Sequence, residues 1–270
     1  MYCFQLVNGF KFDFRIYVLL TSVISPMNIF IYNDGLVRLA SEQYSANANF
    51  DDPYIHLTNY SLNKNSSSFD QGKHKLRLSD VLKGELTSEC KGKTYRRSAR
   101  DLNHEIEQIV IKTIFTVQPQ LQHLYRTSQA KEPDIVCDLL GFDVMLDSKL
   151  KPWILEVNHL PSFRADTKLD ADVKHDLIKN TLQIMQLGVE YRRQLEVVLR
   201  KEKAQAMIDS GVRRMTAKEH SLRVRFDIKL IESLVPNNRF KRIYPLDAGQ
   251  YAPGLEEFYM QLEKFSNRTW

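Results

Sequence analysis

Hydrophobic and polar residues alternate along residues 11–20, which predicts a β-strand with one apolar and one polar face. The apolar positions are Phe12, Phe14, Ile16 and Val18. The polar positions are Lys11, Asp13 and Arg15. Residues 28–33 and 36–40 read as two further strands that flank Asp34-Gly35, a dipeptide that favours a tight hairpin turn. These segments together predict an antiparallel sheet with one polar face.

A second alternating region, residues 141–158, reads as two strands joined by a short polar turn. One face of this hairpin is apolar, and we expect it to be buried; its residues are Phe142, Val144, Leu146, Trp153, Leu155 and Val157. Asp143, Glu156 and Asn158 share the other face. If the hairpin closes symmetrically around Lys149 and Leu150, Asp143 stands opposite Glu156, with Cβ atoms roughly 5 Å apart.

Two carboxylates this close repel each other unless a positive charge lies between them. A hard cation with oxygen ligands, most simply Mg²⁺ carrying a nucleotide phosphate, fits Asp143, Glu156 and the Asn158 amide. The pattern alone leaves an ordinary exposed hairpin face as an equal alternative.

The remaining pattern predicts helices that pack on this sheet. Apolar residues recur at helical spacing along residues 104–125 and 172–185. Residues 41–80 are rich in Asn, Ser and Asp, so we expect one long loop there. The fold class is therefore α+β. We expect a catalytic lobe over residues 1–187 and a basic helical extension over 188–270, with helices at 191–208 and 217–234.

Composition favours a folded intracellular protein. The chain has 270 residues, 43% of them hydrophobic, which is enough to bury a substantial core. Three widely spaced cysteines match neither a disulfide framework nor a zinc signature, so a reducing cytoplasm is the simplest setting. The longest apolar run, residues 16–31, is shorter than the roughly 20 residues of a membrane-spanning helix and is interrupted by polar residues. We expect two strands and a turn there, and no membrane insertion.

Charge is distributed unevenly along the chain. Residues 191–242 hold 14 Lys and Arg against 6 Asp and Glu, whereas the whole chain has a net charge of +5. A basic segment on a near-neutral body predicts an acidic partner. Nucleic acid is disfavoured as that partner, because the aromatic and glycine motifs of common RNA-binding modules are missing from the sequence.

Four ordered motifs give the chain a specific resemblance. They are Lys11-Phe12-Asp13-Phe14-Arg15, Tyr32-Asn33-Asp34-Gly35-Leu36-Val37-Arg38, His56-Leu57-Thr58-Asn59-Tyr60-Ser61, and the 141–158 hairpin. Together they resemble the tubulin tyrosine ligase-like family, and most of all its polyglutamylases. The resemblance runs from about Leu6 to about Met185, and Arg239 to Pro245 resembles a later segment of some members. It implies the C-terminal part of an ATP-grasp fold, incomplete at its N-terminus.

The resemblance also implies a reaction and a role for each matching residue. Family members use ATP to convert a glutamate carboxylate to an acyl phosphate, which the amino group of free glutamate attacks. The implied nucleotide-binding residues are Lys11, Asp13, Arg15, Arg38, His56, Thr58 and Asn59. The implied Mg²⁺ ligands are Asp143, Glu156 and Asn158, and the implied catalytic residues are Arg15, Arg38 and Glu156. The implied substrate-binding residues are Arg38, Lys64 and His159.

Partners and location follow from the same resemblance. We expect a monomer that acts on tubulin tails and microtubules in the cytoplasm and cytoskeleton, including the cilium, axoneme or basal body. Leu160 and Arg164 stand where the family more often has small residues, which leaves substrate preference open. A glycine ligase and a non-catalytic microtubule-binding homologue are the alternatives.

Overall fold

The protein is described here from a computed structural model. It describes residues 6–22, 27–45, 49, 51–70, 72–90, 92–127, 138–185, 193, 237–245 and 261. The chain forms two compact units, Met1–Asp176 with Phe240–Trp270, and Leu177–Arg239. The first unit contains nearly all of the described residues and every feature of the candidate site.

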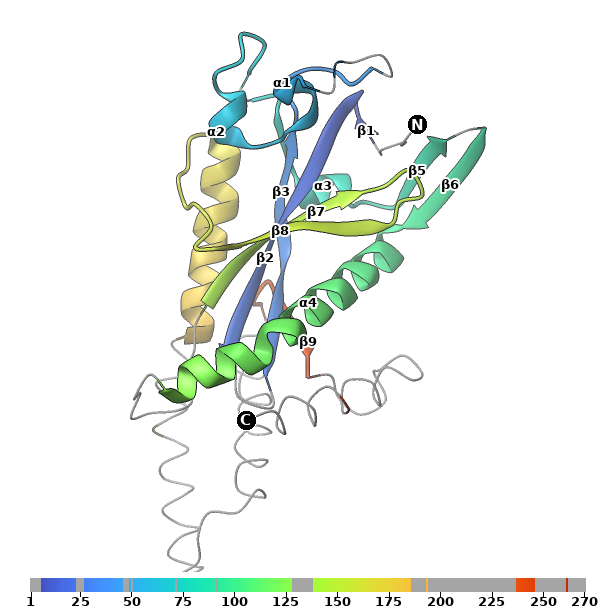
Figure 1. The fold of residues 1–270 in the computed structure, drawn as a ribbon. Coiled ribbons are helices and arrows are strands. Elements are labelled where there is room, and N and C mark those ends of the chain that lie inside the picture. Colours follow the sequence, from blue (N-terminus) through green and yellow to red (C-terminus); the bar gives the residue numbers. More distant parts are fainter. Residues whose placement is uncertain are drawn as a thin grey trace, which may run out of the picture. The chain divides into compact units, whose positions relative to one another are not determined.

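Strands and helices follow one another as shown in Figure 1. The strands are β1 (Leu6–Val7), β2 (Phe10–Ser22), β3 (Asn28–Leu39), β4 (Lys75–Arg77), β5 (Glu85–Cys90), β6 (Lys93–Ser98), β7 (Asp138–Leu146), β8 (Pro152–His159) and β9 (Phe240–Tyr244). The helices are α1 (Pro53–His56), α2 (Tyr60–Asn63), α3 (Leu78–Val81) and α4 (Ala99–Thr127), followed by a helix over residues 168–185.

Seven strands form one antiparallel sheet in the order β4-β3-β2-β7-β8, with β1 paired to β2 and β9 paired to β3. β5 and β6 form a separate two-stranded hairpin. The alternation in β2 and β3 gives the large sheet two distinct faces. The α+β class predicted from the sequence is confirmed.

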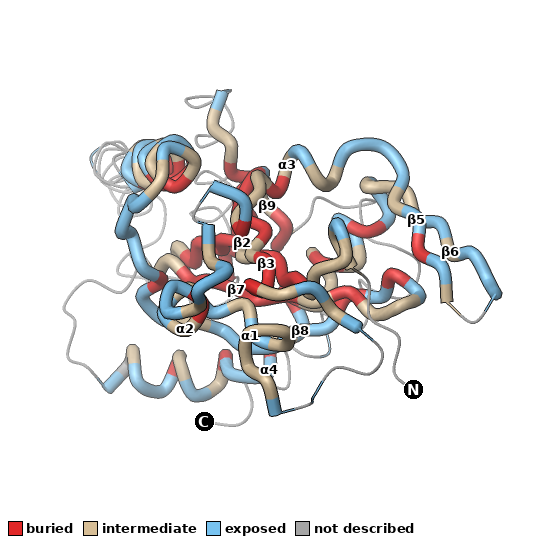
Figure 2. The backbone as a smooth tube through the Cα atoms, turned by 90° about the horizontal axis from the view of Figure 1, so that it is seen from above, coloured by how far each residue is buried: buried red, intermediate tan, exposed pale blue. Residues whose placement is uncertain are grey.

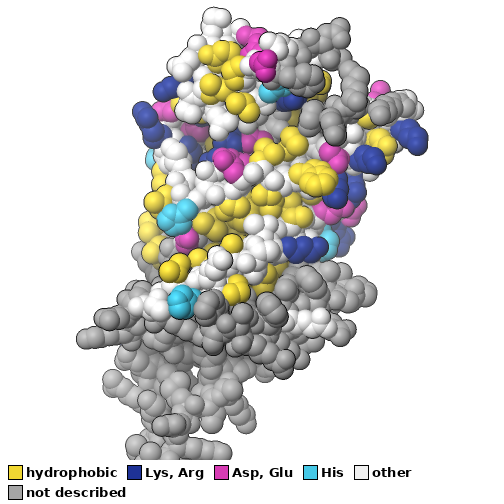
Figure 3. All heavy atoms as spheres, in the orientation of Figure 1, with side chains coloured by type: hydrophobic (Ala, Val, Ile, Leu, Met, Phe, Trp, Pro, Cys, Tyr) yellow, Lys and Arg dark blue, Asp and Glu magenta, His cyan; other side chains and the backbone are white. Residues whose placement is uncertain are grey.

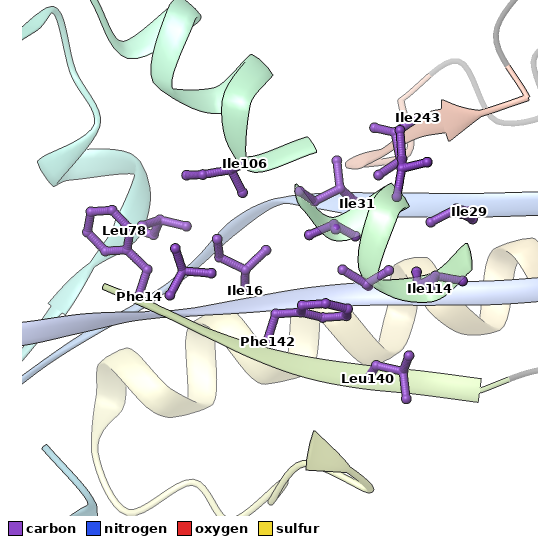
Figure 4. Close-up of a cluster of buried hydrophobic side chains, with 14 of the residues drawn as sticks. Phe14, Ile16, Ile29, Ile31, Leu78, Ile106, Ile114, Leu140, Phe142 and Ile243 are labelled. Atoms are coloured by element: carbon purple, nitrogen blue, oxygen red, sulfur yellow. The ribbon is translucent and has the colours of Figure 1, made fainter. Parts of the chain in front are cut away.

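The apolar face of the sheet packs against α4 and α3. Phe14 and Ile16 of β2, Phe142 of β7 and Ile106 of α4 meet in one buried cluster (Figure 4). Burial is concentrated on β2, β3 and β7, whereas the β5–β6 hairpin is largely exposed (Figure 2). Side chains from α4 and α3 fill this face, and the polar residues Lys11, Asp13 and Arg15 of β2 lie on the opposite face of the sheet.

The helix over residues 168–185 is tied to the sheet through its first turns. Thr167 caps its beginning, since Thr167 Oγ1 accepts from the Asp170 backbone N–H at 3.1 Å. Lys75 pairs with Asp170 at 2.6 Å, and Tyr32 Oη donates to Asp176 at 2.8 Å. Within the second unit, Asn180 Oδ1 accepts from the Arg239 backbone N–H at 2.8 Å.

The predicted hairpin turn at Asp34-Gly35 is wrong. Both residues lie inside β3, which continues from Asn28 to Leu39. Asp34 is buried and accepts from the backbone N–H of Gly35 and from Arg77 Nε, at 2.9 and 2.6 Å. A Cβ on Gly35 would overlap the carbonyl oxygen of Arg15. Glycine is therefore needed here for close approach of two strands, not for a turn.

The single long loop predicted for residues 41–80 is also wrong. This segment contains α1, α2, β4 and α3. Asn63 is buried and accepts the Ser41 backbone N–H at 3.0 Å, while its own amide donates to Leu57 O at 2.8 Å. The abundant Asn, Ser and Asp residues cap short helices and hold turns, so the polar composition reflects a compact segment.

The β7–β8 hairpin confirms the predicted pairing but not the predicted burial. Asp143 stands opposite Glu156, as expected. Trp153, Leu155 and Val157, which we expected in the core, are 49%, 52% and 41% exposed. A bulge is the main reason: Asp143 pairs with Glu156 but Val144 pairs with Ile154, so β8 carries one extra residue.

The bulge shifts the alternation of β8. Ile154, not Leu155, packs against the core, and Trp153 pairs with Met145. Val157 keeps the predicted register opposite Phe142 but is partly exposed because β8 is the edge strand of the sheet. A band of hydrophobic side chains is therefore visible on the surface over β8 (Figure 3).

The two predicted helices of the catalytic lobe are confirmed by α4 and by the helix over residues 168–185. Of the predicted basic extension at 188–270, only Arg193, residues 237–245 and Gln261 are described. The helices predicted at 191–208 and 217–234 lie outside the described residues apart from Arg193. Within the described part of the chain, no helix combines the length and apolar character needed to cross a membrane.

Candidate nucleotide and metal site

Neighbouring strands place the predicted polar residues in rows across one face of the sheet. Asp13 of β2 pairs with Arg38 of β3, and Arg15 of β2 pairs with Asp143 of β7. Asp143 in turn pairs with Glu156 of β8. Residues that pair directly across an antiparallel ladder point to the same face. The rows therefore collect charged side chains from four strands on the face opposite the α4 core.

Two arginines neutralise the two buried carboxylates of this face. Arg15 binds both oxygens of Asp143, with Nε–Oδ1 at 2.5 Å and Nη2–Oδ2 at 2.9 Å. Arg38 binds Asp13 through Nε at 2.8 Å and through Nη2, and the same Nη2 lies 2.7 Å from Asp143 Oδ2. Asp13 and Asp143 are each 1% exposed. Arg38 is thus the bridge between two buried acids.

The pKa shifts in this cluster show that the opposite charges outweigh burial. Burial alone would raise the pKa of Asp143, but the hydrogen bond from Arg15 and the charges of Arg38 and Arg15 lower it. Burial would lower the pKa of Arg38, but the hydrogen bond and charge of Asp13 and the charge of Asp143 raise it. Burial outweighs the charges at Tyr17: it raises the pKa of the phenol to about 12, although the charges of Arg15 and Arg38 lower it.

Glu156 and Asn158 complete the acidic edge of this cluster. Asn158 Nδ2 donates to Glu156 Oε1 at 2.9 Å and lies 3.3 Å from Asp143 Oδ2. The hairpin that carries them is fixed by its turn, where Asp147 Oδ1 accepts the backbone N–H groups of Lys149 and Lys151. The predicted convergence of Asp143, Glu156 and Asn158 on one side of one hairpin is confirmed.

A cavity of ≈290 Å³ opens beside the cluster. The predicted residues that line it are Lys11, Asp13, Arg38, His56, Thr58, Asn59, Asp143 and Glu156. The lining residues that we did not predict to be in the site are Phe12, Leu57, Met145 and Leu155. Segments that lie far apart in the sequence therefore meet at one hollow with a charged wall and an apolar wall.

The segment of α1 and the residues after it closes one side of this cavity. Asp52 caps α1 by accepting the Tyr54 backbone N–H at 2.9 Å, and Pro53 occupies the first turn. His56 ends the helix, and its Nδ1 lies 2.8 Å from Lys11 Nζ. The chain then runs through Thr58 and Asn59 along the cavity.

Four predicted site residues do not line the cavity: Arg15, Lys64, Asn158 and His159. Asn158 contacts it through its hydrogen bonds to Glu156 and Asp143. Arg15 reaches it indirectly, through its two bonds to Asp143. Lys64 is exposed at the C-cap of α2. The side chain of His159 is 69% exposed and lies 3.5 Å from Asp138 Oδ1. Substrate-binding roles for Lys64 and His159 stay predictions.

Leu155 of the apolar wall was missed because of the bulge in β8. Regular alternation assigns Leu155 to the core, whereas the extra residue turns it toward the cavity beside Met145. Nothing in the spacing of hydrophobic residues signals a bulge. Leu57 stands inside a recognised motif, and its 48% exposure gives the cavity an apolar edge.

The residues present fit a magnesium ion with a nucleotide phosphate. Glu156 and Asn158 offer a carboxylate and an amide oxygen, the hard donors that Mg²⁺ prefers. Asp143 offers a third, although both of its oxygens already contact arginine. No group of three or more His, Cys, Asp or Glu side chains able to hold a metal occurs among the described residues. The donor set therefore depends on Asn158. Lys11 and Arg38 are cations on the same cavity, as an anionic phosphate requires.

Comparison with known proteins assigns this fold and site to a family. The model of the tubulin-tyrosine ligase family matches residues 5–194. The chain belongs to this family. It is 42% identical over 189 residues to tubulin polyglutamylase TTLL6 of Homo sapiens and 33% identical over 264 residues to tubulin polyglutamylase ttll6 of Danio rerio. It is 38% identical over 213 residues to the probable beta-tubulin polyglutamylase of Tetrahymena thermophila.

These matches cover most of this chain but a minority of each relative. They take in 67%, 91% and 76% of this chain, and 20%, 32% and 18% of the human, zebrafish and Tetrahymena proteins. The chain thus spans between about a fifth and a third of the length of these relatives. All of the residues that line the cavity fall within the family match.

Proposed function

We propose that this protein acts as an ATP-dependent ligase that adds glutamate to tubulin tails. The observation that carries the proposal is the arrangement around Arg38, which bridges Asp13 and Asp143 at the wall of a cavity that also presents Lys11 and Glu156. Its relatives are named as tubulin polyglutamylases, which supports glutamate and tubulin as substrates.

Each part of the site has a task in such a reaction. Lys11 binds phosphate oxygens of ATP. Glu156 and Asn158, with Asp143, would hold Mg²⁺, which would offset negative charge on the phosphates. Arg15 and Arg38 orient anionic oxygens of the phosphate and of the reacting carboxylate, because a planar guanidinium can bind two oxygens at once. The apolar wall of Leu57, Met145 and Leu155 keeps water from one side of the cavity.

The chemistry proposed is the acyl phosphate route of the family. The γ-phosphoryl group of ATP passes to a glutamate carboxylate of the tubulin tail, which leaves ADP. The amino group of free glutamate then attacks the acyl carbon, and phosphate leaves as the amide bond forms. In this scheme the two arginines and the metal ligands position the reactants, and no side chain of the chain becomes covalently modified.

Tubulin recognition is assigned to the basic segment 191–242, which holds 14 Lys and Arg against 6 Asp and Glu. An acidic tubulin tail is a suitable partner for such a charge, which supports a location at microtubules. A location in cilia rests on the family resemblance alone. Changing Arg192, Arg193, Arg213, Arg214, Arg223 and Arg225 to Glu should weaken co-sedimentation with microtubules. Raising the salt should weaken binding of the unchanged chain, because charge attraction is screened over about 8 Å at physiological ionic strength.

The test of function is incubation of the chain with tubulin, ATP, Mg²⁺ and glutamate, followed by mass spectrometry of the tubulin tails. Tails lengthened by whole glutamate residues, with no lengthening when ATP is omitted, support the proposal. Addition of glycine from a mixture of both amino acids indicates a glycine ligase instead. Microtubule binding without nucleotide binding indicates a non-catalytic homologue, and rejects the proposal for this chain.

A further inference from the structure

Lys11 is enclosed by two aromatic residues that come from a different part of the chain. Its Nζ lies 2.8 Å from His56 Nδ1 and 4.8 Å from the centre of the Tyr44 ring. The rings of Tyr44 and His56 also contact each other, with centroids 6.1 Å apart. A protonated lysine has only N–H donors, so Nδ1 of His56 is the acceptor in this contact.

A second hydrogen bond fixes the orientation of the His56 ring. His56 Nε2 lies 3.0 Å from the carbonyl oxygen of Asn49, which accepts but cannot donate. The ring therefore carries its proton on Nε2, and the lone pair of Nδ1 accepts from Lys11. An imidazolium would carry a proton on both nitrogens and would repel the ammonium group.

Both aromatic residues are held in place by the backbone. Tyr44 is tied to the turn directly before the strand that bears Lys11, since its backbone N–H donates to Gly9 O at 2.9 Å. His56 ends a helix whose start is capped by Asp52, and the Glu42 N–H donates to Tyr54 O at 3.1 Å. The two rings therefore limit the positions that the flexible lysine side chain can occupy.

We propose that Tyr44 and His56 are positioning residues that hold the Lys11 ammonium group ready for the phosphates of a nucleotide. This rests on the proposed function, since it assumes that the cavity takes a nucleotide. Fixing a four-carbon side chain before binding lowers the entropy lost on binding. Burial also lowers the pKa of Lys11, so hydrogen bonding to His56 and contact with the Tyr44 ring help to keep its charged form in place.

The arrangement makes nucleotide affinity depend on the acceptor that position 56 presents to Lys11. Leucine at this position removes that acceptor, so the Lys11 ammonium group would lose its fixed position. Glutamine at position 56 offers an oxygen to Lys11 and an N–H to Asn49, so it is the conservative replacement.

The experiment measures the affinity of the chain and its variants for ATP with Mg²⁺ by calorimetry at one neutral pH. For His56→Leu we expect affinity about tenfold weaker than for the unchanged chain, the scale of one hydrogen bond to a charged group. His56→Gln should recover most of this loss. Tyr44→Phe should match the unchanged chain, and Tyr44→Leu should bind about tenfold more weakly.

Two results overturn the proposal: equal affinity in His56→Leu and the unchanged chain, or equal affinity in Tyr44→Leu and Tyr44→Phe. If the unchanged chain binds no nucleotide, the proposed function fails, and heteronuclear NMR of the His56 ring still decides the positioning role. We expect the proton on Nε2 in the unchanged chain and in Lys11→Met, because the Asn49 carbonyl accepts from Nε2 in both. The nitrogen chemical shift of Nδ1 should change in Lys11→Met, since Nδ1 loses its donor, and stay unchanged in Tyr44→Phe. The same Nδ1 shift in Lys11→Met and the unchanged chain rejects the contact.

Discussion

Asp143 faces Glu156 directly across β7 and β8, at the position where β8 carries one extra residue. The bulge separates two surfaces of the same strand. On one side of it Glu156 and Leu155 line the cavity, and on the other Ile154 packs against the core. One irregular residue thus allows an edge strand to supply both an acid and an apolar wall to the site.

Removing the bridge between the two buried acids should destabilise the fold. We expect Arg38→Met to lower the free energy of unfolding by about 3–5 kcal/mol, because Asp13 and Asp143 would share a buried region with one arginine instead of two. Urea denaturation measures the loss. The control is Arg96→Met on the exposed β5–β6 hairpin, where the nearest acid, Glu85, lies 4.0 Å away and the expected change is within about 0.5 kcal/mol. Equal losses in both variants would contradict the bridging role.

Acid should remove the stabilisation contributed by Asp143. Its pKa in the folded protein is lowered, so its stabilisation is present above the ordinary unfolded value of about 3.9 and is lost as pH falls through the folded value. We expect Asp143→Asn to be less stable than the unchanged chain at neutral pH. The difference should shrink below about pH 4. Urea denaturation across this range measures it, and a constant difference at all pH values would reject the assignment.

The stabilisation contributed by Tyr17 should be lost in alkali, whereas that of Asp143 is lost in acid. The pKa of Tyr17 is raised to about 12, so its stabilisation is present below the ordinary value of about 10 and is lost as pH rises through the folded value. Tyr17→Phe cannot ionise, and we expect its stability to fall less steeply than that of the unchanged chain between about pH 10 and 12. If the free energy of unfolding falls equally in the two proteins over this range, the raised pKa of Tyr17 is contradicted.

Close approach of β2 and β3 should make position 35 intolerant of any side chain. In Gly35→Ala the new methyl group would overlap the Arg15 carbonyl oxygen and lie 3.1 Å from Leu78 Cδ2. Overpacking of this kind costs roughly 1–3 kcal/mol, and a backbone clash places the expected loss at the upper end. Gly72→Ala is the control, because its methyl group would meet only Asp70 Oδ1, at 3.4 Å. Thermal unfolding of both variants tests this, and an unchanged midpoint in Gly35→Ala would contradict it.

Regular alternation in the sequence was enough to predict the polar and apolar faces of β2 and the pairing of Asp143 with Glu156. Tertiary contacts decided the features that it did not predict. Asp34 and Gly35 carry a strong local turn signal, but a buried ion pair with Arg77 and the approach of β2 keep them in a strand. The prediction that Trp153 is buried was wrong, because the hydrophobic pattern of the sequence does not indicate the extra residue of the bulge. The motif residues His56, Thr58 and Asn59 reach the cavity as predicted by family resemblance, which periodicity alone would not have indicated.

Binding of ATP with Mg²⁺ tests the central claim, that this cavity is the nucleotide and metal site of a tubulin glutamate ligase. Calorimetry should compare the unchanged chain with Glu156→Gln, which removes a charge from an exposed acid of the site, and with the control Glu89→Gln on the exposed β5 strand. We expect the unchanged chain and Glu89→Gln to bind alike, and Glu156→Gln to bind Mg²⁺-ATP at least about tenfold more weakly while melting at the same temperature. Equal affinity in all three proteins, or no binding by the unchanged chain, would contradict the account.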